Sequence, residues 1–135
     1  MKYMLTFIAD QRRMKDTIDD EMKGAMDAWK AFDQEAVDAG VLIACEPLEY
    51  AEDAITIRVD QDGDRTNTDG PFAETKEQLA GFALLEVKDF DEAMDWAAKV
   101  PVAPGTVIEV RQVMDLSRFG YESSTVSPAK AKATA

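Results

Sequence analysis

Three side chains near the middle of the sequence could carry out acid–base chemistry or hold a small ligand. Asp69, Glu74 and Lys76 follow closely on one another. Two carboxylates can act as general acid and general base where burial raises one pKa toward neutrality, and a lysine ammonium can anchor an anion. The same segment starts with turn-forming residues at 69–71, and Phe72 could fill the core. We therefore predict Asp69 and Glu74 as candidate catalytic residues, with a purely structural turn as the alternative.

Two arginines lie in segments where apolar and polar residues alternate. Arg58 belongs to the run AITIRV, and Arg111 belongs to VIEVRQVM together with Glu109. A guanidinium can bind a carboxylate or phosphate through two parallel hydrogen bonds, so both arginines could hold an anion in a cleft. The alternative is that these charges pair with one another or face solvent. The candidate ligand-binding residues are Arg58, Arg111, Glu109, Lys76 and Phe72.

The residues that the chain lacks exclude several kinds of site. There is no histidine and only one cysteine, Cys45, which excludes histidine-based triads, histidine-rich zinc sites and cysteine-only metal clusters. The aspartates of DQDGD alternate as in a calcium loop, but Arg65 replaces the required glycine and Pro71 the required glutamate. We predict no metal and no cofactor. Cys45 is expected to fill space in the core, with its pKa raised by Glu46.

Charge and hydropathy limit the partners. The chain has 27 acidic and 15 basic residues, a formal net charge of −12, so it lacks the clustered cations that a nucleic-acid surface needs. No apolar run approaches the ~20 residues of a membrane span, and the N-terminus shows no export signal. We predict a cytoplasmic protein that binds neither nucleic acid nor membrane.

The length of 135 residues fits one domain, and 46% hydrophobic residues suffice for a core. We place this domain at residues 1–116. The remainder, 117–135, is rich in Ser, Thr, Ala and Lys, and we expect it to be a flexible tail or to wrap a partner.

Hydrophobic periodicity predicts two strand–helix–strand units. The apolar run 2–8 and the run 41–45 flank a helix that begins at Thr17 and stops at Gly40. Apolar residues spaced by three and four mark the core side of this helix: Ile18, Met22, Ala25, Met26, Trp29, Phe32, Ala36 and Val37. In the second unit, strands at 81–87 and 107–114 flank a helix capped by Asp89 and Glu92 and ended by Pro101.

An inserted hairpin separates the two units. Ile55, Ile57 and Val59 alternate with polar residues, which predicts a strand with one buried face. The dipeptide Asp62-Gly63 predicts a tight turn in which both residues have positive φ, followed by a short partner strand at 65–68. One helical turn is predicted at 74–78.

These elements predict an α+β, ferredoxin-like βαββαβ subunit whose antiparallel sheet carries both helices on one face. The first strand is largely apolar on both sides, so the other face also needs cover. A second copy of the chain is the simplest cover, which predicts a homodimer through the sheet face.

The segment DGPFAETKEQLAGF at 69–82 resembles the signature of the DGPF subgroup of YCII-related proteins. Other matching segments follow in the same order, and the resemblance covers residues 1–116: MKYML at 1–5, AGVL at 39–42, EVKDFDEA at 86–93 and IEVR at 108–111. The resemblance implies a ferredoxin-like subunit that forms a dimeric α/β barrel with a cleft between two facing sheets. Phe72 and Lys76 belong to this signature.

The resemblance leaves the activity open. A histidine with a nearby aspartate is suspected of catalysis in the wider YCII family, and this chain has no histidine for that role. We favour a homodimer that binds a small, anionic ligand in the inter-sheet cleft. One alternative is an enzyme of the dimeric α/β barrel type that uses Asp69 and Glu74. Another is an accessory protein of a sigma-factor-linked regulatory system, because DGPF proteins are often encoded near such factors.

Overall fold

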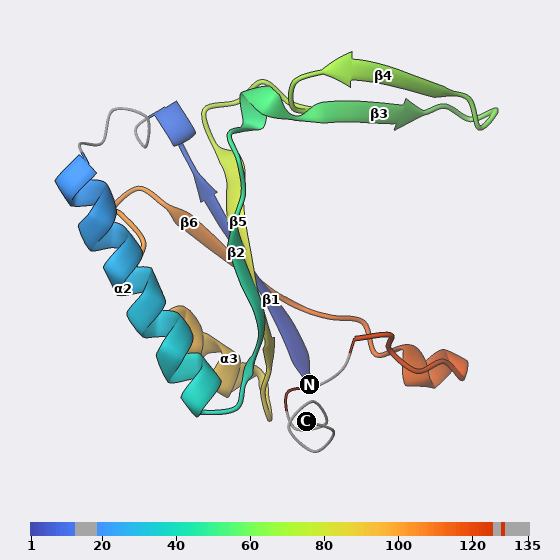
Figure 1. Cartoon of the computed structure of the whole chain (residues 1–135). Coiled ribbons are helices and arrows are strands. Elements are labelled where there is room, and N and C mark those ends of the chain that lie inside the picture. The colour runs from blue at the N-terminus through green and yellow to red at the C-terminus, as the bar shows by residue number, and fades with distance from the viewer. Residues whose placement is uncertain (13–18, 126–127, 129–135) are drawn as a thin grey trace.

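A computed structural model describes residues 1–12, 19–125 and 128 (Figure 1). Its strands and helices follow in chain order: β1 (Lys2–Ala9), α2 (Asp19–Asp38), β2 (Leu42–Pro47), the 3-10 turn η1 (Ala51–Asp53), β3 (Ile55–Val59), β4 (Arg65–Asp69), β5 (Gln78–Glu86), α3 (Phe90–Ala97), β6 (Val107–Gln112) and the 3-10 turn η2 (Leu116–Phe119). No helix within the described residues is both long enough and apolar enough to cross a membrane.

Four of the strands form one antiparallel sheet in the order β2-β5-β1-β6. Each βαβ unit leaves a gap of one strand that the other unit fills, which is the ferredoxin-like arrangement. Both helices lie on the same face of this sheet (Figure 1). The α+β class, the topology and the single helical layer are therefore confirmed.

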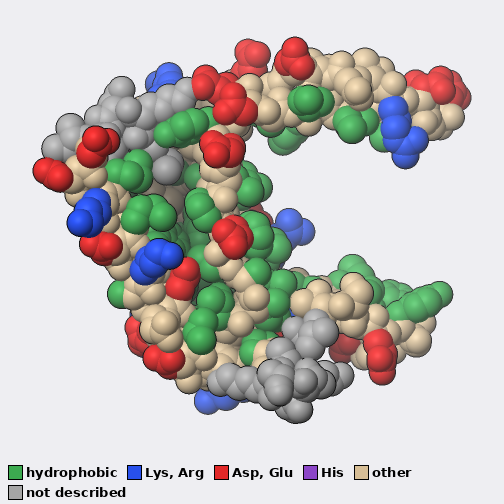
Figure 2. Space-filling model, viewed as in Figure 1, with side chains coloured by type: hydrophobic (Ala, Val, Ile, Leu, Met, Phe, Trp, Pro, Cys, Tyr) green, Lys and Arg blue, Asp and Glu red, His purple; other side chains and the backbone are tan. Residues whose placement is uncertain are grey.

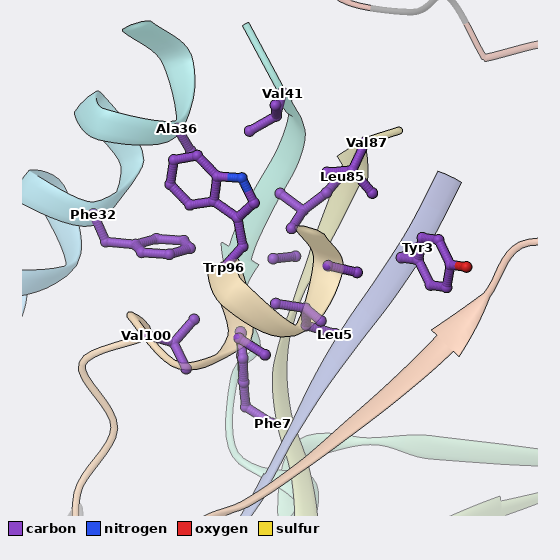
Figure 3. Packing of buried hydrophobic residues seen from close by; sticks show 13 residues of the cluster. Tyr3, Leu5, Phe7, Phe32, Ala36, Val41, Leu85, Val87, Trp96 and Val100 are labelled. Carbon is purple, nitrogen blue, oxygen red and sulfur yellow. The ribbon is translucent and has the colours of Figure 1, made fainter. Parts of the chain in front are cut away.

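The hydrophobic core lies between the sheet and the two helices (Figure 3). Leu5 of β1 and Leu85 of β5 are fully enclosed there. Aromatic rings connect the layers. The ring centres of Trp29 on α2 and Phe7 on β1 lie 5.1 Å apart, and those of Phe32 on α2 and Trp96 on α3 lie 6.1 Å apart. Burial of such large side chains contributes about 2 to 3 kcal/mol each, so these contacts hold the helices on the sheet.

Only part of the predicted apolar stripe of α2 packs against the sheet. Phe32 and Ala36 are buried, but Met26 and Val37 are exposed. The expectation that Met26 belongs to the core is therefore wrong. A periodic stripe shows which side chains share a face, and it does not show how far that face extends beyond the sheet beneath it. The predicted cap at Thr17 lies outside the described residues.

The second helix begins as the capping pattern predicts. Asp89 accepts a hydrogen bond from the backbone N–H of Glu92 at 2.9 Å. The Glu92 carboxylate accepts from the backbone N–H of Lys88 at 3.1 Å, one residue before the expected partner. These bonds satisfy backbone donors that a helix start leaves without partners.

The inserted strands β3 and β4 form a separate two-stranded ribbon, here called the hairpin arm. The chain reverses at the tip of the hairpin arm, where Gly63 has φ +87°. The backbone N–H of Gly63 donates to the Asp60 carbonyl at 3.0 Å. The Asp60 carboxylate also accepts from the backbone N–H groups of Asp62 and Asp64. Among the described residues only glycines have positive φ, so the predicted two-residue turn with positive φ at Asp62 is wrong.

The segment that follows β6 lies near the start of β1. The backbone N–H of Val113 donates to the Lys2 carbonyl at 2.8 Å, and the Lys2 ammonium donates to Ser123 Oγ at 2.8 Å. Residues 113–125, called the C-terminal segment below, are thereby attached to the sheet. The rest of the predicted tail, apart from Pro128, lies outside the described residues.

Gly81 of β5 is a point of close backbone approach. A Cβ atom at this position would lie 2.9 Å from the carbonyl oxygen of Glu46 on β2. We expect Gly81→Ala to lower the free energy of unfolding by about 1 to 3 kcal/mol, because the clash is with backbone of a paired strand. Urea unfolding followed by circular dichroism measures this change.

Gly24→Ala is the matched control. Gly24 lies in α2, and nothing lies within 4 Å of a Cβ added there. Alanine should therefore stabilise the helix by roughly 0.5 to 1 kcal/mol. Equal effects of the two substitutions would contradict the close approach of β2 to β5.

Candidate functional site

The sheet face turned away from the helices, here called the open face, carries an apolar surface. Tyr3, Leu5 and Phe7 of β1 point into the core, so the alternating residues Met4, Thr6 and Ile8 lie on the open face. Strand register places Leu84 of β5 beside Met4 and Phe82 beside Thr6. Each of these side chains is partly accessible to solvent in the single chain. The apolar character expected on both faces of the sheet is thus confirmed.

A charged pair borders this apolar surface on the edge strand β6. Arg111 lies opposite Met4, and Glu109 lies opposite Thr6. The Arg111 Nε atom lies 3.6 Å from Glu109 Oε1, and the Arg111 side chain is 77% exposed. The two terminal nitrogens of Arg111 make no hydrogen bond within the described part of the chain. A guanidinium whose terminal donors have no partner among the described residues therefore stands beside apolar side chains.

The hairpin arm carries a second apolar surface. Ile55, Ile57 and Val59 share one face of the ribbon, and each is more than half exposed. The prediction of a strand is confirmed, but the prediction that its apolar face is buried is wrong for the single chain. Alternation identifies the residues of one face, and it does not show whether the same chain covers that face.

The predicted site residues of the hairpin arm do not meet those of the sheet. Arg58 lies on the ribbon face opposite the apolar one, where its Nη2 donates to the Phe72 carbonyl at 3.4 Å. Phe72 itself is 78% exposed, so the expected core position is wrong. Asp69 ends β4 opposite Ile55. Arg58 and Arg111 therefore belong to two different sheets.

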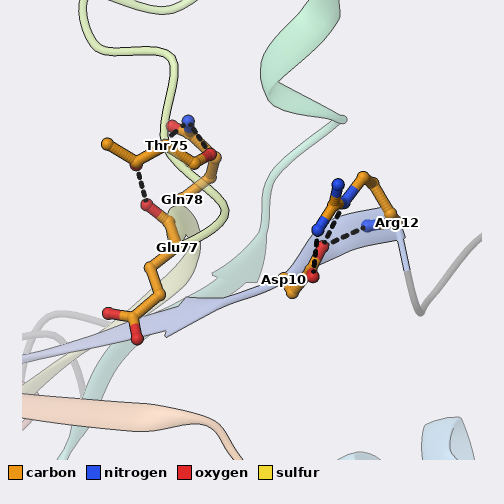
Figure 4. Close-up of polar contacts among 5 residues, drawn as sticks. All are labelled: Asp10, Arg12, Thr75, Glu77 and Gln78. Carbon is orange, nitrogen blue, oxygen red and sulfur yellow. Dashed lines mark hydrogen bonds and ion pairs between the residues drawn. The ribbon is translucent and has the colours of Figure 1, made fainter.

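A cavity of about 320 Å³ lies at the base of the hairpin arm. Glu74 and Lys76 line it together with Asp10 and Arg12 from the end of β1. Figure 4 shows the polar contacts around it. Asp69 is not among its lining residues, so the structure does not bring the two predicted catalytic carboxylates into one cavity. An adjoining cavity of about 350 Å³ is lined mainly by apolar residues, among them Leu48 and Leu79.

The segment between β4 and β5 is a loop, so the predicted helical turn at 74–78 is wrong. The Gln78 side chain closes this loop by donating to the carbonyls of Ala73 and Thr75, each at 2.8 Å. The Thr75 hydroxyl donates to the Glu77 carbonyl at 2.6 Å (Figure 4). Side chains that bond nearby backbone groups in this way compete with helix formation.

Residues 10–12 form the other wall of the cavity. Gln11 is buried, accepts from the backbone N–H of Ala51 at 2.8 Å and donates to the Glu49 carbonyl at 3.5 Å. Arg12 binds Asp10 through Nε at 2.9 Å and Nη2 at 2.8 Å (Figure 4). This bidentate bond lowers the pKa of Asp10 from 3.8 to about 2. Asp10 is therefore an anion and no general acid near neutrality.

The sequence pattern does not single out these three residues. The run DQRRMKD is polar and has no period, which predicts only a loop. The available signal is the buried strand that ends immediately before Asp10, since polar residues at a strand end often line a site. The Asp–x–Arg spacing itself permits the local ion pair that is observed.

Cys45 lies on the core side of β2 and is half-buried. The pKa of this thiol is raised to about 12, mainly by burial. The thiol's hydrogen bond to the Asp33 carboxylate and the negative charges of Asp33 and Glu46 also contribute to this rise. The predicted direction of the shift is confirmed, with burial as the largest cause. A protonated thiol is a weak nucleophile, so Cys45 does not act as one here.

The C-terminal segment adds exposed apolar side chains at the other end of the open face. They are Met114, Leu116, Phe119 and Tyr121. Figure 2 shows that the hairpin arm and this segment project on the same side of the sheet and enclose a hollow above the open face. Hydrophobic side chains line both projections toward this hollow (Figure 2).

The sequence matches the YCII-related domain over residues 1–117. This chain belongs to the YCII-related family. An uncharacterized protein of Rhizobium meliloti (strain 1021) is 40% identical over 78 residues, which cover 58% of this chain and 62% of that protein. The match thus spans about three fifths of the relative's length, and the relative's name assigns no activity.

The bond between Asp10 and Arg12 gives this YCII-related protein a testable electrostatic signature. We expect Arg12→Ala to raise the pKa of Asp10 from about 2 toward the ordinary 3.8, because the guanidinium is its main stabilising partner. Carboxyl-carbon NMR titration of Asp10 measures the shift. Since the folded pKa is depressed, the bond stabilises the fold above pH 4, and this contribution is lost as pH falls from about 4 to 2.

Asp115 provides the control for this titration. Its pKa is also lowered, but by hydrogen bonds from Ser117. Its titration should therefore not change in the Arg12→Ala variant. An Asp10 curve that stays near 2 without Arg12 would contradict the assigned cause.

Proposed function

We propose that this YCII-related protein is a homodimer that binds a small anionic ligand between two facing sheets, with Arg111 as the anchor. The supporting observation is the Arg111 guanidinium, whose terminal nitrogens have no partner in the described chain and which borders the apolar open face. A planar fork of free N–H donors is suited to a carboxylate or phosphate. The neighbouring Met4 and Leu84 would contact an apolar part of the same ligand.

A second copy supplies what one chain lacks. The open face and the hairpin arm leave apolar side chains exposed on the same side of the molecule (Figure 2). Exposed apolar patches of this kind are costly in water and mark interaction sites. Two sheets facing each other at ~10 Å, the usual spacing of packed sheets, would cover both patches and enclose a cleft.

The polar cavity at the hairpin base adds a second place for ligand contacts. Lys76 and Arg12 bring cationic groups to it, and Glu74 and Asp10 bring carboxylates. Arg12 is already engaged by Asp10, which leaves Lys76 as the cation that can approach a ligand. We assign the cavity to the rim of the cleft and keep Arg111 as the principal anchor.

The enzyme alternative has less support from the geometry. Acid–base catalysis with two carboxylates needs both groups at one reaction centre. Glu74 lines the cavity and Asp69 does not, while the other carboxylate near Lys76, Asp10, is held ionised by Arg12. The alternative of a sigma-factor-linked accessory protein rests on the family resemblance alone.

The remaining expectations stand as predictions. They are membership of the DGPF subgroup, a cytoplasmic location, and a domain at 1–116 followed by a tail at 117–135 that is flexible or wraps a partner. The subunit fold holds independently of all three.

Arg111→Ala should remove ligand binding. The wild-type protein is screened by thermal shift against small carboxylates and phosphates, and any anion that raises the melting temperature is titrated by calorimetry. We expect Arg111→Ala to weaken binding of that anion at least tenfold, since a charge-assisted bidentate contact contributes about 1.5 to 3 kcal/mol. Arg111→Lys should retain part of the affinity as a point charge.

Arg65→Ala is the control for loss of one positive charge. Arg65 lies at the tip end of the hairpin arm and is exposed. Its removal should leave the affinity within a factor of two if Arg111 acts by direct contact. A panel in which no anion shifts the melting temperature, or equal losses in both variants, would contradict the proposed ligand site.

A further inference from the structure

The two projections beside the hollow both carry exposed apolar side chains. The hairpin arm presents Ile55, Ile57 and Val59, and the C-terminal segment presents Met114, Leu116, Phe119 and Tyr121. A ribbon of only two strands is marginally stable in water unless something covers it. Within the described residues β3 and β4 pair only with each other, so the cover must come from elsewhere.

The length of the hairpin arm indicates that its cover is a second copy. Each of its strands has five residues, which corresponds to roughly 17 Å of extended chain. Two facing sheets lie only ~10 Å apart. In a face-to-face dimer the hairpin arm therefore reaches past the gap and runs along an edge of the partner.

We infer that, in the homodimer of the proposed function, the apolar face of each hairpin arm packs against the C-terminal segment of the other copy. The hairpin arm and the C-terminal segment lie at opposite ends of the sheet (Figure 1). A twofold axis between the facing sheets, perpendicular to the line between the two projections, exchanges these ends in the partner. Each hairpin arm then meets the partner's C-terminal segment. A twofold axis parallel to the line between the two projections would instead pair hairpin arm with hairpin arm.

Charge favours the first arrangement at the tip of the hairpin arm. The tip is acidic overall, because it carries Asp60, Asp62 and Asp64 against the single cation Arg65. In this dimer the hairpin arm of one copy and the C-terminal segment of the other run in opposite directions. The tip of the hairpin arm therefore approaches the root of the partner's C-terminal segment, where that segment leaves the partner's sheet. Lys2 lies at that root, with its ammonium bonded to Ser123 Oγ and the Thr125 carbonyl. Opposite charges therefore meet at this end of the contact.

The base of the hairpin arm is acidic, with Asp53 and Asp69. The C-terminal segment carries Arg118 between Asp115 and Glu122, and the Arg118 guanidinium lies 4.8 Å from the Phe119 ring centre. In the alternative arrangement an acidic tip would approach an acidic base. Like charges brought together in this way are unfavourable.

This contact would complete the ligand site. The hollow is bounded on one side by the open face and at its ends by the two projections (Figure 2). When the partner's projections lie against these ends, the hollow above Arg111 is closed to water. Each ligand site is then bounded by residues of both copies.

Disulfide trapping between separate variants tests the pairing. Ile57→Cys and Leu116→Cys are prepared separately, one with an isotope label, then mixed, allowed to exchange and oxidised mildly. We expect the mixed disulfide to exceed either self-linked product at least tenfold. Mass spectrometry of intact covalent dimers distinguishes the products. Phe119→Cys replaces Leu116→Cys if the latter variant does not fold.

The matched control and light scattering separate the outcomes. Thr66 lies on the opposite face of the ribbon, across from Arg58, so Thr66→Cys with Leu116→Cys should give little mixed product. Efficient self-linking of Ile57→Cys would overturn the pairing in favour of two hairpin arms in contact. A dimer by light scattering that forms no mixed disulfide would overturn the pairing but leave the proposed function. A monomer at micromolar concentration would overturn both.

Discussion

The sheet has two apolar faces, and the two helices of one chain cover only one of them. On β1, Leu5 and Phe7 lie in the core while Met4 and Ile8 lie on the open face. A sheet face left in this state is unfavourable in water, because apolar surface costs about 25 cal/mol for each Å² exposed. The proposed dimer, its cleft and the proposed role of the hairpin arm all depend on this uncovered face.

The insertion between β2 and β5 changes what that face can enclose. Without it the open face would be bounded at one end only, by the C-terminal segment. The hairpin arm raises a wall at one end, and the C-terminal segment raises another (Figure 2). Loops and insertions of this kind are where a shared fold acquires its specific site. The two cavities at the base of the hairpin arm form where the insertion joins the sheet.

The sequence predicts the subunit better than it predicts the site. Strand and helix periods, the Asp89 cap and the order of the two βαβ units depend on local chemistry, and they are confirmed. The exposure of Ile57 and Phe72 and the cavity shared by Asp10 and Lys76 depend on how distant segments are arranged. Periodicity carries no information on such contacts, because it reports faces and not what lies against them.

The strongly acidic composition is compatible with an anionic ligand, because binding depends on the charges next to the ligand and not on the net charge of the chain. Facing sheets would remove water from around Arg111, and a desolvated cation is unfavourable unless an anion compensates it. Glu109 approaches only one nitrogen of Arg111, at 3.6 Å, and the two terminal nitrogens make no hydrogen bond to the described residues. A bound carboxylate or phosphate would supply the missing compensation. Ligand binding and dimer formation should therefore stabilise each other, as linkage requires of two events that share one desolvated charge.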